Sequence, residues 1–304
     1  MQSKMTSSET TTIYALDFDG VLVDSASETG NSGWKAAKIL FPDASWIQDL
    51  DNDADKLQTL IHRFCQVRPC LETGWEAALI IKLLADPAEG NPSNEDILNN
   101  FQSTYKQRIL TSSSSSSSNN NNLDKQVCND ALSQARNGWI AQNDAQDWLD
   151  AHDFYHGACT AVKTFLRQHG NENIYIITTK AKDYAKRLLE KEGLYKTDCD
   201  CSTTSSSTSK TIQEEHIFGL GSGPKHEVLA SILEQRNADR AVMVEDNLKT
   251  LDKIMAHNPI KDKTTPFLAS WGYNTTAQQE RARESQYRVL SEIDPGTLSE
   301  IFKQ

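Results

Sequence analysis

The sequence predicts an α/β fold in which a parallel sheet is interrupted, after its first strand, by a block of helices. Short apolar runs suited to buried strands occur near the start of the chain and again beyond residue 150, where they alternate with segments of helical periodicity. Strands that alternate with helices pair in parallel, with helices on both faces of the sheet. Between about residues 26 and 153 the helical pattern continues without a convincing strand.

Each predicted element has its own local signal. Four apolar runs have the length and composition of strands: Ile13–Phe18, Ile174–Thr178, Ala241–Asp246 and Pro266–Ser270. Apolar residues recur with the i, i+3, i+4 spacing of a helix in three segments between them: 158–166, 181–189 and 228–233. Gly170 and Gly193 supply the expected ends of the first two helices.

The helical block begins directly after the first strand. Leu57–Cys65 forms an apolar helical stripe, and Trp75–Leu84 is a strongly apolar helix candidate. A chain of 304 residues has room for two unequal domains. We therefore predict a disordered tail at 1–11, a core formed by 12–25 and 154–304, and a helical domain at 26–153. The alternative is a separate helical domain unrelated to the core's function.

Two segments are too polar to fold by themselves. Thr111–Asn122 is a serine run followed by an asparagine run, and Ser202–Ser209 is rich in serine and threonine. Neither carries enough apolar surface to offset the entropy lost on ordering. Both are predicted to be inserts within loops, the first inside the helical domain.

The composition of the chain limits the classes of binding partner and the cellular compartment that we expect. The net charge of −11 argues against nucleic acid or an anionic membrane as a partner. No apolar run approaches the roughly 18 residues of a membrane-spanning helix, and residues 1–12 lack the apolar core of a signal peptide. The six cysteines form no CxxC pair, so we expect reduced thiols in a cytoplasmic protein. The oligomeric state cannot be read from the sequence.

Two acids follow the first predicted strand. Residues two apart in a strand point the same way, so Asp17 and Asp19 leave the strand end together. Gly20 allows the chain to turn sharply after them. Ligands of open α/β sheets bind where parallel strands end, and we therefore place the reactive site here.

The run Asp17-Phe18-Asp19-Gly20-Val21-Leu22-Val23-Asp24-Ser25 resembles the first motif of the haloacid dehalogenase-like (HAD) hydrolases, in the DxDG(V/T)LxDS form of their phosphatases. Three later motifs of that family occur in order. Thr178 ends a strand, Lys225 begins a helix after a glycine-rich loop and Pro224, and Asp246 ends another strand. The resemblance implies a Rossmann-like core with an inserted helical C1 cap.

The resemblance also implies catalytic roles. Asp17 corresponds to the nucleophile that forms an aspartyl-phosphate. Asp19 corresponds to the general acid and base. Thr178 and Lys225 correspond to groups that stabilise the charge of the phosphoryl group.

The implied cofactor is Mg²⁺, held by Asp17, Asp246 and the backbone carbonyl of Asp19. Phosphate contacts are expected from neighbouring residues: Phe18, Gly20 and Thr179. The fourth motif departs from the usual GDxxxD pattern, because Glu245 replaces the glycine and Thr250 stands in place of the second acid. The secondary acid of the metal site is therefore open between Glu245 and Asp252.

The helical domain and the remaining histidines offer further candidates. Arg68 and Glu72, four residues apart, are expected to share a helix face, as a surface pair or as substrate-binding residues. The string around them, with that at 271–275, resembles a plant and cyanobacterial group of HAD-like phosphatases. His152 and His156 have the i, i+4 spacing of a zinc pair, but no further ligand cluster follows them.

The resulting functional prediction is a Mg²⁺-dependent phosphatase that hydrolyses a small phosphomonoester. Phosphoglycolate is the first substrate to consider, and a larger phosphorylated metabolite or vitamin is the alternative. A phosphomutase of the same superfamily would use the same aspartyl-phosphate. A non-catalytic binding protein of the same fold is the alternative from a different class. Dehalogenase chemistry is disfavoured because it does not need Asp19.

Overall fold

The computed structural model describes residues 10–112, 123–142, 145–196, 210–285, 287–291 and 301. Most of the predicted tail, the serine and asparagine tract from 113 onward, the serine- and threonine-rich tract, and Cys199 and Cys201 lie outside these ranges. The chain divides into two compact units. We call 1–24 with 154–304 the sheet unit, and 25–153 the helical unit.

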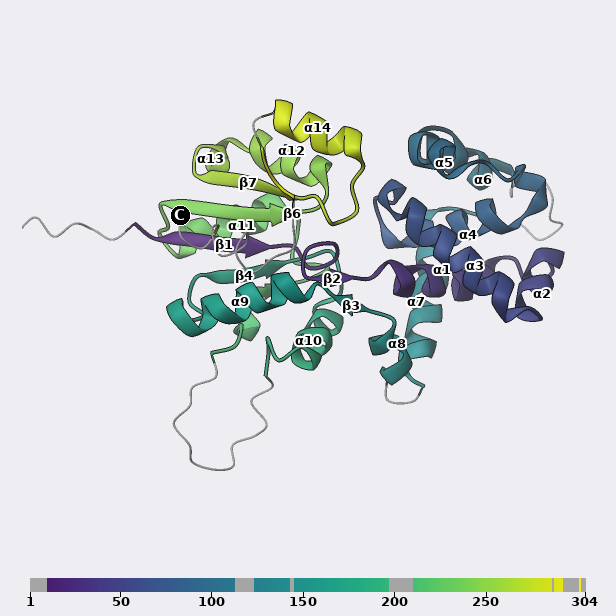
Figure 1. Cartoon of the computed structure of the whole chain (residues 1–304), viewed down its shortest axis with the longest axis horizontal. Helices are drawn as coiled ribbons and strands as arrows, with labels where there is room; N and C mark the ends of the chain where they lie inside the picture. The colour runs from purple at the N-terminus through teal and green to yellow at the C-terminus, as the bar shows by residue number, and fades with distance from the viewer. Residues whose placement is uncertain are drawn as a thin grey trace, which may run out of the picture. The chain divides into compact units, whose positions relative to one another are not determined.

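The sheet unit contains one six-stranded sheet in which every pairing is parallel (Figure 1). From edge to edge its strands are β5 (Ile217–Phe218), β4 (Ile174–Ile177), β1 (Thr12–Leu16), β6 (Arg240–Glu245), β7 (Thr264–Ala269) and β8 (Arg288–Leu290). The predicted fold class, an α/β protein with a Rossmann-like parallel sheet, is confirmed. All four predicted runs form strands, and each observed strand ends one or two residues earlier than predicted.

Helices cover both faces of this sheet. They are α9 (His156–His169), α10 (Lys182–Lys191), α11 (Lys225–Gln235), α12 (Leu248–Ala256), α13 (Asn258–Lys261) and α14 (Thr276–Glu284), with a 3₁₀ turn at Glu214–His216. Ile13 and Ala15 of β1 pack with apolar residues of α11 and α12. Tyr14, between them, points to the opposite face and meets the ring of Phe165 in α9, with 5.0 Å between ring centroids. Successive side chains of β1 therefore point alternately into two helical layers, and both faces of the strand are buried.

The helical unit has eight α-helices among its described residues: α1 (Ala26–Leu40), α2 (Ser45–Asp51), α3 (Ala54–Val67), α4 (Ala77–Ala85), α5 (Asn94–Asn100), α6 (Lys106–Ser112), α7 (Lys125–Ile140) and α8 (Gln146–Asp150). Short 3₁₀ turns occur at Arg68–Cys70, Gly74–Glu76 and Pro87–Glu89, and a π-helical turn at Phe101–Tyr105. Its apolar core includes the almost wholly buried α4. Two short strands, β2 (Val23–Asp24) and β3 (Asp153–Phe154), pair where the chain leaves and re-enters the sheet unit.

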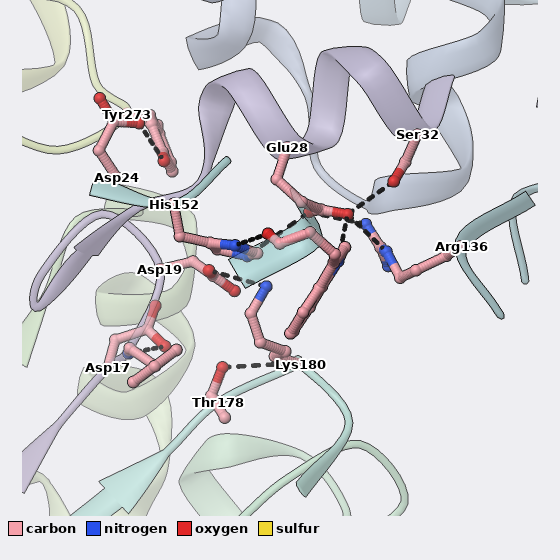
Figure 2. A network of polar contacts seen from close by, with 12 residues as sticks. Asp17, Asp19, Asp24, Glu28, Ser32, Arg136, His152, Thr178, Lys180 and Tyr273 are labelled. Atoms are coloured by element: carbon pink, nitrogen blue, oxygen red, sulfur yellow. Dashed lines mark hydrogen bonds and ion pairs between the residues drawn. The ribbon is translucent and has the colours of Figure 1, made fainter. Parts of the chain in front are cut away.

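A buried carboxylate joins three helices of the helical unit. Glu28 in α1 is fully buried and accepts hydrogen bonds from Ser32 Oγ at 2.6 Å and Arg136 Nε at 2.8 Å (Figure 2). It also accepts from Trp148 Nε1 at 3.2 Å. Burying a charge is costly unless it is paired and hydrogen-bonded. The network therefore ties α1, α7 and α8 together. In the described part of the chain, no helix is both long and apolar enough to cross a membrane.

Candidate active site

Three neighbouring strands place predicted catalytic and metal-binding residues at the same end of the sheet. Asp17 follows β1, Thr178 follows β4 and Asp246 follows β6, and β1 lies between the other two strands. Leu16 is paired with Val244, and the Asp17 N–H donates to the Val244 carbonyl at 2.9 Å. This register sets Asp17 beside the end of β6, where Glu245 and Asp246 follow one another.

Lys225 completes the cluster from a different direction. It is the first residue of α11, immediately after Pro224, so its side chain starts at a helix N-terminus. Its Nζ lies 2.8 Å from Asp17 Oδ1 and 2.7 Å from Glu245 Oε2, and the side chain is only 10% exposed. The structure thus brings Lys225, Asp17 and Glu245 into direct contact.

Burial dominates the electrostatics of these groups. It raises the pKa of Asp17 well above its usual range, and the neighbouring Glu245 raises it further, while Lys225 acts in the opposite direction. Burial also raises the pKa of Glu245. For Lys225, burial alone lowers the pKa, but the charges of Asp17 and Glu245 outweigh it and the pKa is raised overall. One ammonium therefore does not fully compensate the buried carboxylates.

The acidic cluster fits a hard divalent cation. Carboxylate oxygens of Asp17, Glu245 and Asp246, all buried, lie within 4.8 Å of one another, the one such group found among the described residues. Oxygen donors with excess negative charge are what Mg²⁺ prefers. Asp252 lies elsewhere, bonded to Arg281 and, at 3.1 Å, to Tyr287 Oη. Of the two acids left open by the sequence, Glu245 is the one at this cluster.

We expect Mg²⁺ to stabilise the protein more strongly as the pH rises. Carboxyl groups with raised pKa values in the folded state stabilise it at low pH, and this contribution is lost as the pH rises from 3.8, the usual Asp value, through the raised pKa of Asp17. A cation binds the deprotonated form and releases protons. The difference in Tm between samples with Mg²⁺ and with EDTA should therefore grow as the pH is raised above 3.8 and through the raised pKa of Asp17. A constant or shrinking difference would contradict this.

Asp19 has a partner that the sequence did not indicate. Lys180 Nζ lies 3.2 Å from Asp19 Oδ1, and the lysine side chain is 6% exposed (Figure 2). The Lys180 N–H also donates to Thr178 Oγ1 at 3.1 Å, which leaves the hydroxyl its own proton to donate. Lys180 directly follows Thr178 and Thr179 at the strand end. This position beside a predicted catalytic residue is the feature of the sequence that could have indicated a role for Lys180.

Of the three residues predicted to contact phosphate, two have backbone N–H groups that are already hydrogen-bonded, and the third is exposed. The Phe18 N–H donates to Asp17 Oδ1 at 2.7 Å, and the Gly20 N–H donates to the Val23 carbonyl at 2.7 Å. These two backbone donors are therefore engaged within the loop. Thr179 is exposed next to the buried Thr178. A role for these residues in binding phosphate remains a proposal.

Gly20 and Gly272 pack against the side chain of Asp246. A Cβ on Gly20 would lie 2.1 Å from Asp246 Oδ2, and a Cβ on Gly272 would lie 2.3 Å from Asp246 Cβ. No side chain fits at these distances. Both glycines therefore let the backbone approach a candidate metal ligand.

We expect Gly20→Ala to weaken binding of a divalent cation, because the new methyl group must displace Asp246. Gly90→Ala is the matched control, since Gly90 has nearly the same φ (+79° against +82°) but nothing within 4 Å of its hypothetical Cβ. Both variants should lose about 1–3 kcal/mol from backbone strain. Only Gly20→Ala should bind Mn²⁺ more weakly in titrations followed by electron paramagnetic resonance. Equal affinities in the two variants would refute this.

One prediction from helical spacing was wrong. Arg68 and Glu72 do not share a helix face: Arg68 belongs to the 3₁₀ turn Arg68–Cys70, and Glu72 follows the extended residue Leu71. The reason is local, because Thr73 and Glu76 form a capping box that starts a new turn, and Glu76 also accepts from the Glu72 N–H. Their role in substrate recognition stays a proposal.

His152 and His156 are not on one helix either. His152 Nδ1 lies 2.8 Å from the Trp148 carbonyl, and β3 (Asp153–Phe154) separates it from α9, which begins at His156. Neither histidine belongs to the metal-type cluster found in the described ranges. The spacing that suggested zinc therefore does not produce a common face.

Two solved structures resemble the protein over almost its whole length. One, from Lactobacillus delbrueckii subsp. bulgaricus, is called a "putative phosphoglycolate phosphatase"; the match covers 96% of this chain and 98% of that one, with a TM-score of 0.54 and 12% identity. The other is a hydrolase from Pseudomonas syringae, with the same coverage, a TM-score of 0.50 and 16% identity. The protein shares the fold of both. No protein-family model and no curated protein matches the sequence.

Proposed function

We propose that the protein is a Mg²⁺-dependent phosphatase of the HAD type that hydrolyses a small-molecule phosphomonoester. The observation that carries the proposal is the contact of Lys225 with Asp17, within a buried cluster that includes Asp246. A nucleophilic carboxylate, a cation beside it and further acids for a metal are the groups that phosphoryl transfer through a covalent intermediate requires.

In the proposed first step, a carboxylate oxygen of Asp17 attacks phosphorus and the bond to the leaving oxygen breaks. Asp19 gives its proton to that oxygen. Lys225, together with the hydroxyl of Thr178, stabilises the negative charge of the transferring group. Mg²⁺, held by Asp17, Asp246 and the Asp19 carbonyl, would supply further positive charge where the phosphate binds.

In the proposed second step, water hydrolyses the aspartyl-phosphate. Asp19, now deprotonated, accepts a proton from the water as it attacks phosphorus, and Asp17 leaves as a free carboxylate. Lys180, with its Nζ 3.2 Å from Asp19 Oδ1, orients the Asp19 side chain for both transfers, by a hydrogen bond to the protonated carboxyl in the first step and by an ion pair with the carboxylate in the second. Each turnover therefore releases inorganic phosphate and restores both acids.

The helical unit is proposed to act as the cap that excludes water and recognises the substrate. Phosphoglycolate is the first compound to test, on the resemblance of the motifs and on the name given to the Lactobacillus protein. Placement in the plant and cyanobacterial group, a contribution of Arg68 and Glu72 to recognition, and the cytoplasm as location rest on the sequence alone.

The proposal is tested by phosphate release from a panel of phosphomonoesters that includes phosphoglycolate, with Mg²⁺ and with EDTA. We expect release that needs Mg²⁺ and is absent from Asp17→Asn purified in the same way, which controls for contaminating phosphatases. Isomerised phosphate ester without free phosphate would instead indicate a mutase. Absence of turnover and of any phosphoenzyme across the panel would argue for a binding protein.

A further inference from the structure

Asp246 is held by a loop that none of the functional motifs includes. The loop follows β7 and comprises residues 271–274. The Tyr273 N–H donates to Asp246 Oδ2 at 2.7 Å, and the Asn274 side-chain amide donates to the Asp246 carbonyl at 3.1 Å. Gly272 leaves no room for a side chain against Asp246. Backbone and side chain of the candidate metal ligand are thus both positioned by this loop.

The loop is itself fixed to the segment that connects β1 with the helical unit. Tyr273 Oη donates to Asp24 Oδ1 at 2.8 Å (Figure 2). The Trp271 indole N–H donates to the Val21 carbonyl at 3.3 Å, and the Trp271 carbonyl accepts from Tyr155 Oη at 3.4 Å. Asp24 is the last residue of the sheet unit before the chain enters the helical unit at residue 25.

We propose that Tyr273 is a positioning residue for metal binding: its N–H holds Asp246 Oδ2, and its hydroxyl, bonded to Asp24, holds that N–H in place. Because Asp246 Oδ2 accepts from this amide, the loop fixes the direction in which the Asp246 carboxylate faces the acidic cluster. The phenol links the metal ligand to the connecting segment at Asp24, 249 positions earlier in the chain. The inference rests on the proposed function, since it assumes a divalent cation at Asp246.

The test is Tyr273→Phe, which removes the bond to Asp24 and leaves the backbone N–H. Loss of a group that orients a metal ligand commonly weakens metal affinity 10- to 100-fold, and we expect about a 10-fold rise in the Kd for Mn²⁺. The Kd is measured by electron paramagnetic resonance on the full chain, without substrate. The Mg²⁺ concentration that gives half-maximal turnover should rise in parallel, with kcat at saturating Mg²⁺ close to that of the wild type.

Two comparisons separate positioning from simple stabilisation. Tyr195→Phe removes an equivalent phenol-to-carboxylate bond, from Tyr195 Oη to Glu214 at 3.0 Å, away from the acidic cluster, and should leave the Mn²⁺ Kd unchanged. Asp24→Ala should reproduce the effect of Tyr273→Phe on the Mn²⁺ Kd, and the double variant should be no weaker than either single variant, because all three lose the same Tyr273–Asp24 bond. Asp24→Asn, which keeps an acceptor oxygen, should restore most of the affinity.

The failures of the two proposals are distinguishable. If the wild type binds Mn²⁺ but Tyr273→Phe binds it equally well, even with a lowered Tm, the positioning role is overturned while the proposed function stands. If the wild type binds no divalent cation, the metal-dependent function falls and this inference falls with it. Additive losses in the double variant would also overturn the inference, because Tyr273 and Asp24 would then act separately.

Discussion

Asp17→Asn should abolish phosphate release from every substrate that the wild type accepts, a loss of at least about 10⁴-fold, as expected when a covalent nucleophile is removed. The amide is nearly the same size as the carboxylate, so the variant loses the ionisable group beside Lys225 and Glu245 without creating a cavity. The variant should also form no phosphoenzyme. Rapid mixing with labelled substrate and acid quenching measures both the rate and the covalent intermediate.

Asp252→Asn is the matched control for this experiment. Asp252 lies in α12, bonded to Arg281 and Tyr287 rather than to the buried cluster. The same chemical change there should leave turnover close to the wild-type value. An aspartyl-phosphate formed by Asp17→Asn would show that another residue is the nucleophile.

Asp19→Asn should slow the hydrolysis of an alkyl phosphate by about 10²–10⁴-fold, the usual contribution of general acid–base catalysis. The amide can neither protonate the leaving oxygen nor accept a proton from water. An aryl phosphate, whose leaving group needs little protonation, should still phosphorylate Asp17. The phosphoenzyme should then accumulate, because its hydrolysis still needs the base.

The pattern across leaving groups is the measurement that decides the role of Asp19. Acid-quench trapping of Asp19→Asn with the two kinds of substrate should show the intermediate with the aryl ester and little with the alkyl ester. A variant as fast as the wild type on the alkyl phosphate would remove Asp19 from the acid–base role. Equal losses on both esters, with no intermediate, would indicate that Asp19 acts on binding instead.

Local patterns were sufficient for the strands that build the centre of the sheet. β1, β4, β6 and β7 are long apolar runs buried on both faces, so each was predictable without knowing its neighbours. β5 and β8 were not predicted, because they contain two and three residues and lie at the edges of the sheet. Such short segments become strands through pairing with a neighbour rather than through their own periodicity.

Helical spacing failed where local capping competed with it. The interval between Arg68 and Glu72 fits a helix, but Pro69 lies in a 3₁₀ turn and Thr73 caps the next one. His152 and His156 have the same interval and are separated by a strand. Two residues spaced four apart share a helix face only if one continuous helix includes both positions.

The sequence by itself determined the sheet's central strands, the acids at the end of the first strand and the order of the motifs, because continuous apolar runs and the acids that follow them are properties of short segments. Only the tertiary structure placed Glu245, and not Asp252, beside Asp17 and Asp246, paired Lys180 with Asp19 and joined Tyr273 to Asp24. These contacts depend on strand register and on loops from distant parts of the chain. Each apolar run is compatible with many such arrangements, and packing of the whole unit selects one of them.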